Sequence, residues 1–208
     1  MPLSSSVKSS VAKKLEEYEG RHPHLYLDSK GLVTIGIGHF IPNKNELSSV
    51  PLYTVKNNIP FTLASQQKKL EEYTIISQKP KNYKASWYRQ FCTLVMKDSD
   101  INLQRDKHLN TFYSELVSIY NIPNGYKRNF DDYPEVVQKA LFDMIFNLGQ
   151  TKLRNIFVNF NAAIKQENWN DAALESNRPD VNSARNLYVR ELLMQASNIP
   201  KTNQEVHQ

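Results

Sequence analysis

The sequence predicts an α+β fold in which a small β lobe and a larger helical lobe are joined by a long helix. Three observations predict it: an amphipathic helix followed by short extended segments, a long helical pattern from Asp98, and dense helical periodicity after Pro134. A chain of 208 residues can bury one good core, so we expect a single domain. Its expected parts are the first helix and small lobe at about 1–97, the connecting helix at about 98–121 and the helical lobe at about 122–208.

The small lobe begins with apolar side chains at helical spacing: Val7, Val11, Leu15 and Tyr18. Gly20 follows where a left-handed residue would end the helix, which leaves Glu19 in its last turn. Extended segments are expected at 25–27 and 32–37, around the turn Asp-Ser-Lys-Gly, so the lobe holds a hairpin or a three-stranded sheet. Prolines interrupt residues 41–97, where we expect one helix near 63–76.

The long helix is expected to start at Asp98–Asp100 and to reach about Tyr120. Its apolar side consists of Ile101, Leu109, Phe112, Leu116 and Ile119. Pro134 is placed to open the next helix, which Gly149 should stop. Its periodic apolar residues are Val136, Ala140, Leu141, Met144, Ile145 and Leu148. Further helices are expected near 153–166, 169–176 and 182–196.

Composition and charge exclude several classes of protein. No apolar run approaches the roughly 20 residues that span a bilayer, so membrane insertion is not expected. The single cysteine, Cys92, allows neither an internal disulfide nor a Cys-x-x-Cys pair, and we expect it to be buried. The net charge of +5 favours an anionic partner, but no motif that reads nucleic acid accompanies it. The start of the chain lacks the apolar stretch of a secretory signal, so we expect synthesis in the cytoplasm and export by another system.

Two acids, Glu19 and Asp28, stand nine positions apart on either side of a bend near Pro23. Cleavage of a glycosidic bond needs one protonated acid and one ionised carboxylate. The negative end of the first helix favours the neutral form of Glu19, and a polar turn favours the ionised form of Asp28. Such a spacing alone is far more often surface charge than an active site.

The complete string around them, YEGRHPHLYLDSKGLVTIGIGHFI, strongly resembles the catalytic signature of the T-even phage lysozymes, glycoside hydrolase family 24. It is closer still to the muramidase domains of pesticin-like bacteriocins and type VI secretion effectors. The resemblance implies a lysozyme-like fold with a cleft between its lobes and a general acid at Glu19. It also implies that Asp28 orients or activates the attacking water and that the Thr34 hydroxyl holds that water from its other side.

His39 most resembles a structural histidine of the family that pairs with a carboxylate on the connecting helix, and Asp106 is our candidate for that partner. We therefore expect neither a general base at His39 nor a metal site, and no cofactor. Gly36 and Gly38 lack the third glycine of a dinucleotide fingerprint, since position 41 is isoleucine. We expect them to let the strand backbone approach a sugar closely.

The resemblance continues in ALFDMIFNLG, NWNDAALES and SARNLYVREL, in the order that the family has. It implies that the far wall of the cleft binds substrate through Asn147, that Phe146 packs beside it, and that Arg185 reaches Glu19 in the resting state. Gly38 and Phe40 are the expected substrate contacts of the near wall. Core packing for Phe146 and a surface ion pair for Arg185 are the alternatives.

The sequence therefore predicts a muramidase that cuts the bond between N-acetylmuramic acid and N-acetylglucosamine, with inversion. Its expected partners are peptidoglycan strands in the periplasm or cell wall and, if it is a toxin, an immunity protein; we expect a monomer. A phage endolysin, a bacteriocin and a secreted effector remain open as settings. The alternative function is a wall-binding or structural module of a phage tail or secretion spike, without turnover.

Overall fold

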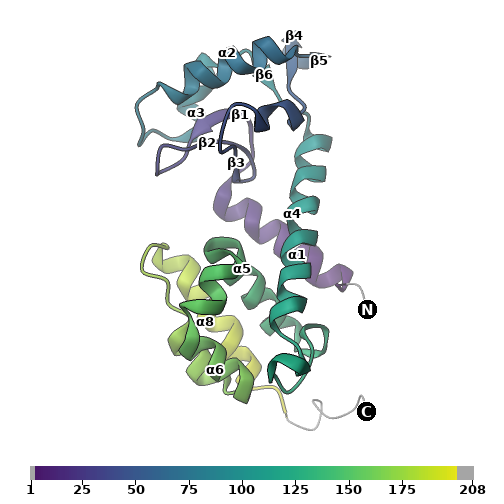
Figure 1. Ribbon diagram of the computed structural model, residues 1–208, viewed down its shortest axis with the longest axis vertical. Coiled ribbons are helices and arrows are strands. Elements are labelled where there is room, and N and C mark those ends of the chain that lie inside the picture. Colours follow the sequence, from purple (N-terminus) through teal and green to yellow (C-terminus); the bar gives the residue numbers. More distant parts are fainter. Residues whose placement is uncertain (1–2, 201–208) are drawn as a thin grey trace. The chain divides into compact units, whose positions relative to one another are not determined.

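A computed structural model describes residues 3–200 of the chain, and they form an α+β fold in two compact units (Figure 1). The sheet unit comprises Leu15–His108, and the helical unit combines the chain up to Lys14 with the residues from Leu109 onward. Small antiparallel sheets thus come early in the sequence and most of the helical region comes late, as predicted.

The first helix and the first sheet follow the predicted pattern. They are α1 (Ser5–Glu19), β1 (His22–Leu27), β2 (Val33–Gly36) and β3 (His39–Phe40). Gly20 has φ +74 and ends α1 as expected, because a left-handed residue cannot continue the helix. The three strands form one antiparallel sheet in the order β1-β2-β3, in which Tyr26 pairs with Thr34 and Ile35 with His39.

The second part of the sheet unit holds a second three-stranded sheet that the sequence analysis missed. Its elements are η1 (Glu46–Ser49), β4 (Tyr53–Lys56), β5 (Ile59–Leu63), α2 (Gln66–Ser77), α3 (Ala85–Tyr88), η2 (Arg89–Phe91) and β6 (Leu94–Val95), with the strand order β5-β4-β6. Asn57 and Asn58 both have positive φ and form the two-residue turn of the β4–β5 hairpin. Pro60 is tolerated because β5 is an edge strand.

The helices after residue 97 lie close to where periodicity predicts them. They are α4 (Asp98–Ile119), η3 (Ile122–Asn124), η4 (Phe130–Asp132), α5 (Glu135–Asn155), α6 (Val158–Gln166), α7 (Trp169–Glu175) and α8 (Ser183–Ser197). Gly149 leaves helical geometry with φ +69 and ψ 163, although a further helical turn follows it within α5. Helix α8 packs against both α5 and α7.

Each unit has its own apolar core. In the sheet unit Leu25, Ile35 and Ile101 are fully buried, and in the helical unit Leu141, Ile145 and Val189 are. Cys92 is buried as expected, and burial raises the pKa of its thiol to about 12. Within residues 3–200, no helix is both long and apolar enough to cross a membrane.

Candidate active site

Glu19 is the last residue of α1, and its carboxyl group lies against the turn between β2 and β3. A Cβ atom added at Gly38 would stand 3.1 Å from Oε2 of Glu19 and 3.4 Å from its Cδ. Gly38 has φ +66, so a glycine is favoured there on two independent grounds. Glu19 is half-buried against this turn, rather than extended into bulk solvent.

Asp28 organises the turn that follows β1. Its Oδ1 accepts hydrogen bonds from the backbone N–H groups of Lys30 (2.9 Å) and Leu32 (2.8 Å). Its own N–H donates to the carbonyl of Leu32, and Gly31 N–H donates to the carbonyl of Asp28. Within residues 3–200 no hydrogen bond engages Oδ2, so the turn fixes the carboxylate by one oxygen and leaves the second for another partner.

Thr34 is only 3% exposed and stands directly opposite Tyr26 in the β1–β2 pair. Its hydroxyl donates a hydrogen bond to the carbonyl of Leu32 at 3.0 Å. Since a hydroxyl has one hydrogen, the Thr34 oxygen can meet a further group only as an acceptor.

The charges of both acids act on Tyr26, which the sequence analysis did not identify. The ring is buried, and burial together with the charges of Glu19 and Asp28 raises its pKa well above the usual value for tyrosine. The phenol therefore stays neutral, and it lies close enough to both carboxyl groups to be influenced by each. Its position two residues before Asp28, on the same strand face, is the signal that could have identified it.

His39 pairs with a side chain on α4, but the predicted partner was wrong. Its Nδ1 lies 2.8 Å from Nε2 of His108, and Asp106 instead forms an ion pair with Arg105. Burial and the neighbouring His108 lower the pKa of His39 to about 4, so both rings remain neutral near pH 7 and can share one hydrogen bond. His24 makes a separate contact, with Nε2 3.0 Å from the carbonyl oxygen of Ala85.

The glycines of this turn have a packing role that the sequence interpretation did not give them. A Cβ at Gly36 would stand 2.5 Å from Oε1 of Gln104, just as one at Gly38 would meet Glu19. The bare backbone therefore makes room for protein side chains, and the expected close approach of a sugar to these two glycines stays a prediction. Phe40, in the next strand, is 43% exposed and free of the core.

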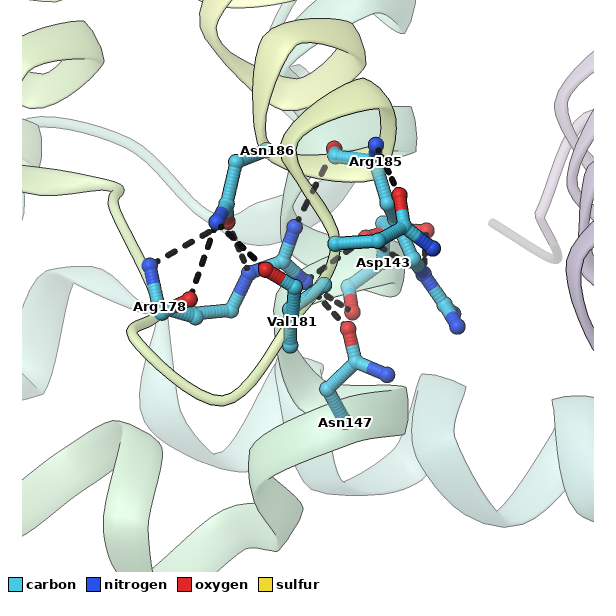
Figure 2. A network of polar contacts seen from close by, with 7 residues as sticks. Asp143, Asn147, Arg178, Val181, Arg185 and Asn186 are labelled. Carbon is cyan, nitrogen blue, oxygen red and sulfur yellow. Dashed lines mark hydrogen bonds and ion pairs between the residues drawn. The ribbon is translucent and has the colours of Figure 1, made fainter. Parts of the chain in front are cut away.

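The helical unit holds the other predicted residues in a buried polar network (Figure 2). Asp143 accepts from Arg178 Nη1 at 2.7 Å and from Arg185 Nε at 3.0 Å, and all three residues are less than 5% exposed. Arg178 also donates to the side chain of Asn186 and to the carbonyl of Arg185. Arg185 is thus a buried residue held by α5, and the surface ion pair considered for it is wrong.

Asn147 and Phe146 lie at the margin of this network, both half-buried. The amide oxygen of Asn147 accepts a hydrogen bond from Arg178, which leaves its NH₂ group as the donor available to a ligand. The ring of Phe146 packs edge-on against Phe112, and the Arg185 guanidinium lies 5.4 Å from its centroid. Arg178, in the loop before α8, is a further site residue that sequence reasoning missed.

In the sheet unit Thr34 stands opposite Tyr26, and the charges of Glu19 and Asp28 both act on that tyrosine. In the helical unit Asn147, Arg178 and Arg185 share one polar network with Asp143, and Phe146 lies beside Arg185. An acid at a helix end and a turn carboxylate with one open oxygen are the two groups that glycosidic cleavage requires. The α+β architecture, with small antiparallel sheets followed by a larger helical region, is that of a protein with a T4 lysozyme-like fold.

The comparisons with known proteins agree with this class. The chain is 26% identical over 167 residues to a Dictyostelium discoideum protein described as "Probable T4-type lysozyme 2", a stretch that covers 80% of this chain and 81% of that protein. The chain is thus a distant homologue of a T4-type lysozyme. No family model matches it, and the finer likeness to pesticin-like and type VI effector domains stays a prediction.

Proposed function

We propose that this protein is a lysozyme that hydrolyses the β-1,4 bond between N-acetylmuramic acid and N-acetylglucosamine in peptidoglycan. The observation that carries the proposal is the pair of acids in the sheet unit, with the Glu19 carboxyl group against the Gly38 turn and Asp28 held by Oδ1 alone. The distant homology to a T4-type lysozyme supports the same activity. The basic surface of the chain, with a net charge of +5, favours adsorption to an anionic wall.

In this proposal Glu19 is the general acid that protonates the leaving glycosidic oxygen. Glu19 is the last residue of α1 and is half-buried, so its carboxyl group is held in place at the helix end. Contact with the Gly38 turn fixes the direction in which the proton is delivered. A positioned acid of this kind contributes about 10²–10⁴-fold to the rate.

Asp28 and Thr34 hold the attacking water. The backbone donors on Oδ1 of Asp28 leave Oδ2 to accept one hydrogen of the water. The hydroxyl of Thr34 is already a donor to Leu32, so its oxygen can accept the other hydrogen. A water that donates both hydrogens presents a lone pair to the anomeric carbon, as direct displacement requires.

Residues of the helical unit bind the substrate. The NH₂ group of Asn147 suits the carbonyl oxygen of an N-acetyl group, because its own oxygen is engaged by Arg178. Phe146 offers an apolar edge beside it. We further propose that Gly38 and Phe40 contact the sugar from the sheet unit.

Glu19→Gln tests the proposal most directly, because it removes the acid and keeps the size of the side chain. Release of reducing ends from purified peptidoglycan should fall by at least about 10²-fold, with the thermal midpoint kept. Glu17→Gln, an exposed glutamate on the same helix, is the matched control and should stay fully active. Full activity of the Glu19 variant would overturn the proposal; wall binding without any reducing ends from the natural protein would indicate a binding module.

We also propose that the reaction inverts the anomeric centre. The two carboxyl groups should then stand roughly 6.5–9.5 Å apart, which leaves room for a water. Proton NMR of freshly cleaved product should show the α-anomer first. Initial appearance of the β-anomer would instead require a covalent intermediate on Asp28.

For the biological setting, we propose that the protein is made in the cytoplasm, reaches peptidoglycan in the periplasm or cell wall through another system and acts there as a monomer. An endolysin, a bacteriocin toxin and a secretion effector all use this chemistry. A holin gene, an immunity gene or a secretion-spike gene beside the coding sequence would separate the three, and an immunity protein is the partner expected for either toxin.

A further inference from the structure

Three aromatic residues form a stripe in the part of the sheet unit that lies outside the resemblance to phage lysozymes. Tyr83, in the bend before α3, Trp87 in α3 and Phe91 in η2 recur every four residues. Tyr83 stacks on Trp87 with ring centroids 4.1 Å apart and planes at 19°, and Phe91 meets Trp87 at 4.9 Å. Tyr83 is 50% exposed, so its ring is stacked on Trp87 and is also accessible from solvent.

The stripe rests on a rigid base. Tyr88 is fully buried beneath it, contacts Trp87 edge-on at 5.1 Å and donates its hydroxyl hydrogen to the carbonyl of Pro80 at 2.7 Å. Asn82 has φ +72, which turns the chain back so that Tyr83 can reach Trp87. A stacked ring fixed in this way loses little conformational entropy when a ligand binds on it.

The segment that carries the aromatic stripe is basic. Residues 78–91 contain three lysines and one arginine and no acidic residue. The ammonium group of Lys79 lies 4.0 Å from the centroid of the Phe91 ring. A ligand on this surface would therefore meet an apolar ring and positive charge together, which fits a ring-shaped molecule that carries carboxylates.

The aromatic stripe is continuous with the candidate active site of the same unit. The aliphatic part of Lys81 lies beside Gly31, since a Cβ added there would stand 3.5 Å from Cδ of Lys81. Gly31 belongs to the turn that Asp28 closes. On the other side, the Ala85 carbonyl is bonded by His24 of β1, the strand that leads to that turn.

We propose that the aromatic stripe and its lysines form an accessory subsite for the peptidoglycan strand, beyond the residues that cleave it. The C–H face of an N-acetylated hexose would lie on Tyr83, and Lys79 and Lys81 would bind carboxylates of the peptide attached to the muramic acid. This inference rests on the proposed function for the identity of the ligand, whereas the binding itself is measured without turnover.

Binding is tested with the full chain carrying Glu19→Gln, so that the wall is not consumed, by co-sedimentation with purified insoluble peptidoglycan. Adding Tyr83→Ala should weaken binding about five- to tenfold, the effect of truncating one central aromatic anchor. Tyr83→Phe keeps the ring and should bind as the parent does. Phe61→Ala is the matched control, because Phe61 is an exposed aromatic of the same unit, also with a lysine over its ring, that stands outside the stripe.

A second substrate separates the ring contact from the charge contact. On chitin, an uncharged polymer of N-acetylglucosamine, Tyr83→Ala should weaken binding and Lys81→Gln should not, whereas both should weaken binding to peptidoglycan. A loss for Tyr83→Ala no larger than that for Phe61→Ala would overturn the subsite. If Tyr83→Ala weakened binding to duplex DNA and not to peptidoglycan, the subsite would also be overturned, and the surface would be one that binds nucleic acid. If Tyr83→Ala weakens wall binding while Glu19→Gln keeps full turnover, the proposed function is refuted and the subsite is supported.

Discussion

Gly38→Ala tests whether the turn between β2 and β3 positions the Glu19 carboxyl group. The substitution has a backbone cost, because an L-residue in the left-handed region loses about 1–2 kcal/mol. A smaller conformational entropy of the unfolded chain offsets about 0.4–1 kcal/mol of this. The net loss of about 1 kcal/mol should lower the thermal midpoint by roughly 2–4 °C in a chain of this size.

The added methyl group should also affect activity, through its contact with the acid. Its Cβ would lie 3.1 Å from Oε2 of Glu19, so the carboxyl group must move by a few tenths of an ångström. Misplacement of a reacting group by about 1 Å can cost about 10²-fold, so we expect a fall of about tenfold in the turnover of peptidoglycan at 25 °C.

Gly125→Ala is the matched control for this experiment. Gly125 has φ +85, and its added Cβ would meet nothing closer than the ammonium nitrogen of Lys165 at 3.7 Å. It should therefore lose similar stability and keep its activity. Equal activities of the two variants, measured well below their thermal midpoints, would refute the idea that Gly38 holds the acid in place.

Three further predictions concern other buried groups. Tyr26→Phe removes the hydroxyl that both acids influence, so kcat should fall about tenfold at an unchanged thermal midpoint, and an unchanged kcat would contradict its role. Asp143→Ala leaves two buried arginines without their carboxylate; urea unfolding should show a loss of about 3–5 kcal/mol, and a loss under about 1 kcal/mol would argue against this network. The pKa of His39 is about 4 in the folded protein against 6.5 for a free histidine, so the unfolded chain takes up its proton first. The free energy of unfolding should therefore fall between pH 6.5 and about 4, and His39→Gln should reduce that slope; the same slope in both proteins would contradict the assignment.

The sequence predicted an element correctly where a cap or turn residue occurs beside a periodic pattern of apolar residues. Gly20 predicts the end of α1 at Glu19, and the Asp-Ser-Lys-Gly turn predicts the β1–β2 hairpin, because both depend on backbone geometry that few residues adopt. The carboxylate positions follow from these two elements. That is why the sequence alone could assign Glu19 to a helix end and Asp28 to a turn.

The missed features depend on which side chains meet across the fold. Asp106 and His108 are two positions apart on α4 and so point to different sides of the helix, and spacing along the sequence cannot decide which one faces His39. Arg178 gives no sequence signal, because a charged residue in a loop beside a proline is ordinarily exposed. Its burial depends on Asp143, which is far from it in the sequence.

The second sheet was missed because prolines and asparagines suggest a loop, yet its hairpin turn has a recognisable form. Two adjacent asparagines with positive φ are the signal of a two-residue hairpin, and alternating side chains flank them. We gave Pro60 too much weight, since a proline excludes a central strand and not an edge strand.

Pro60 also has a consequence for how this protein behaves at high concentration. Strand β5 presents Ile59, Phe61 and Leu63 with 59–65% of their surface exposed, a pattern that usually invites strands of other molecules to add on and aggregate. In a two-residue hairpin the residues beside the turn, here Lys56 and Ile59, exchange hydrogen bonds with each other. The next pair, Val55 and Pro60, does not, so the backbone nitrogen of Pro60 points away from β4, toward the open edge of the sheet. The nitrogen of Pro60 carries no hydrogen, so a strand that added to β5 would lack one hydrogen bond at the centre of the pairing.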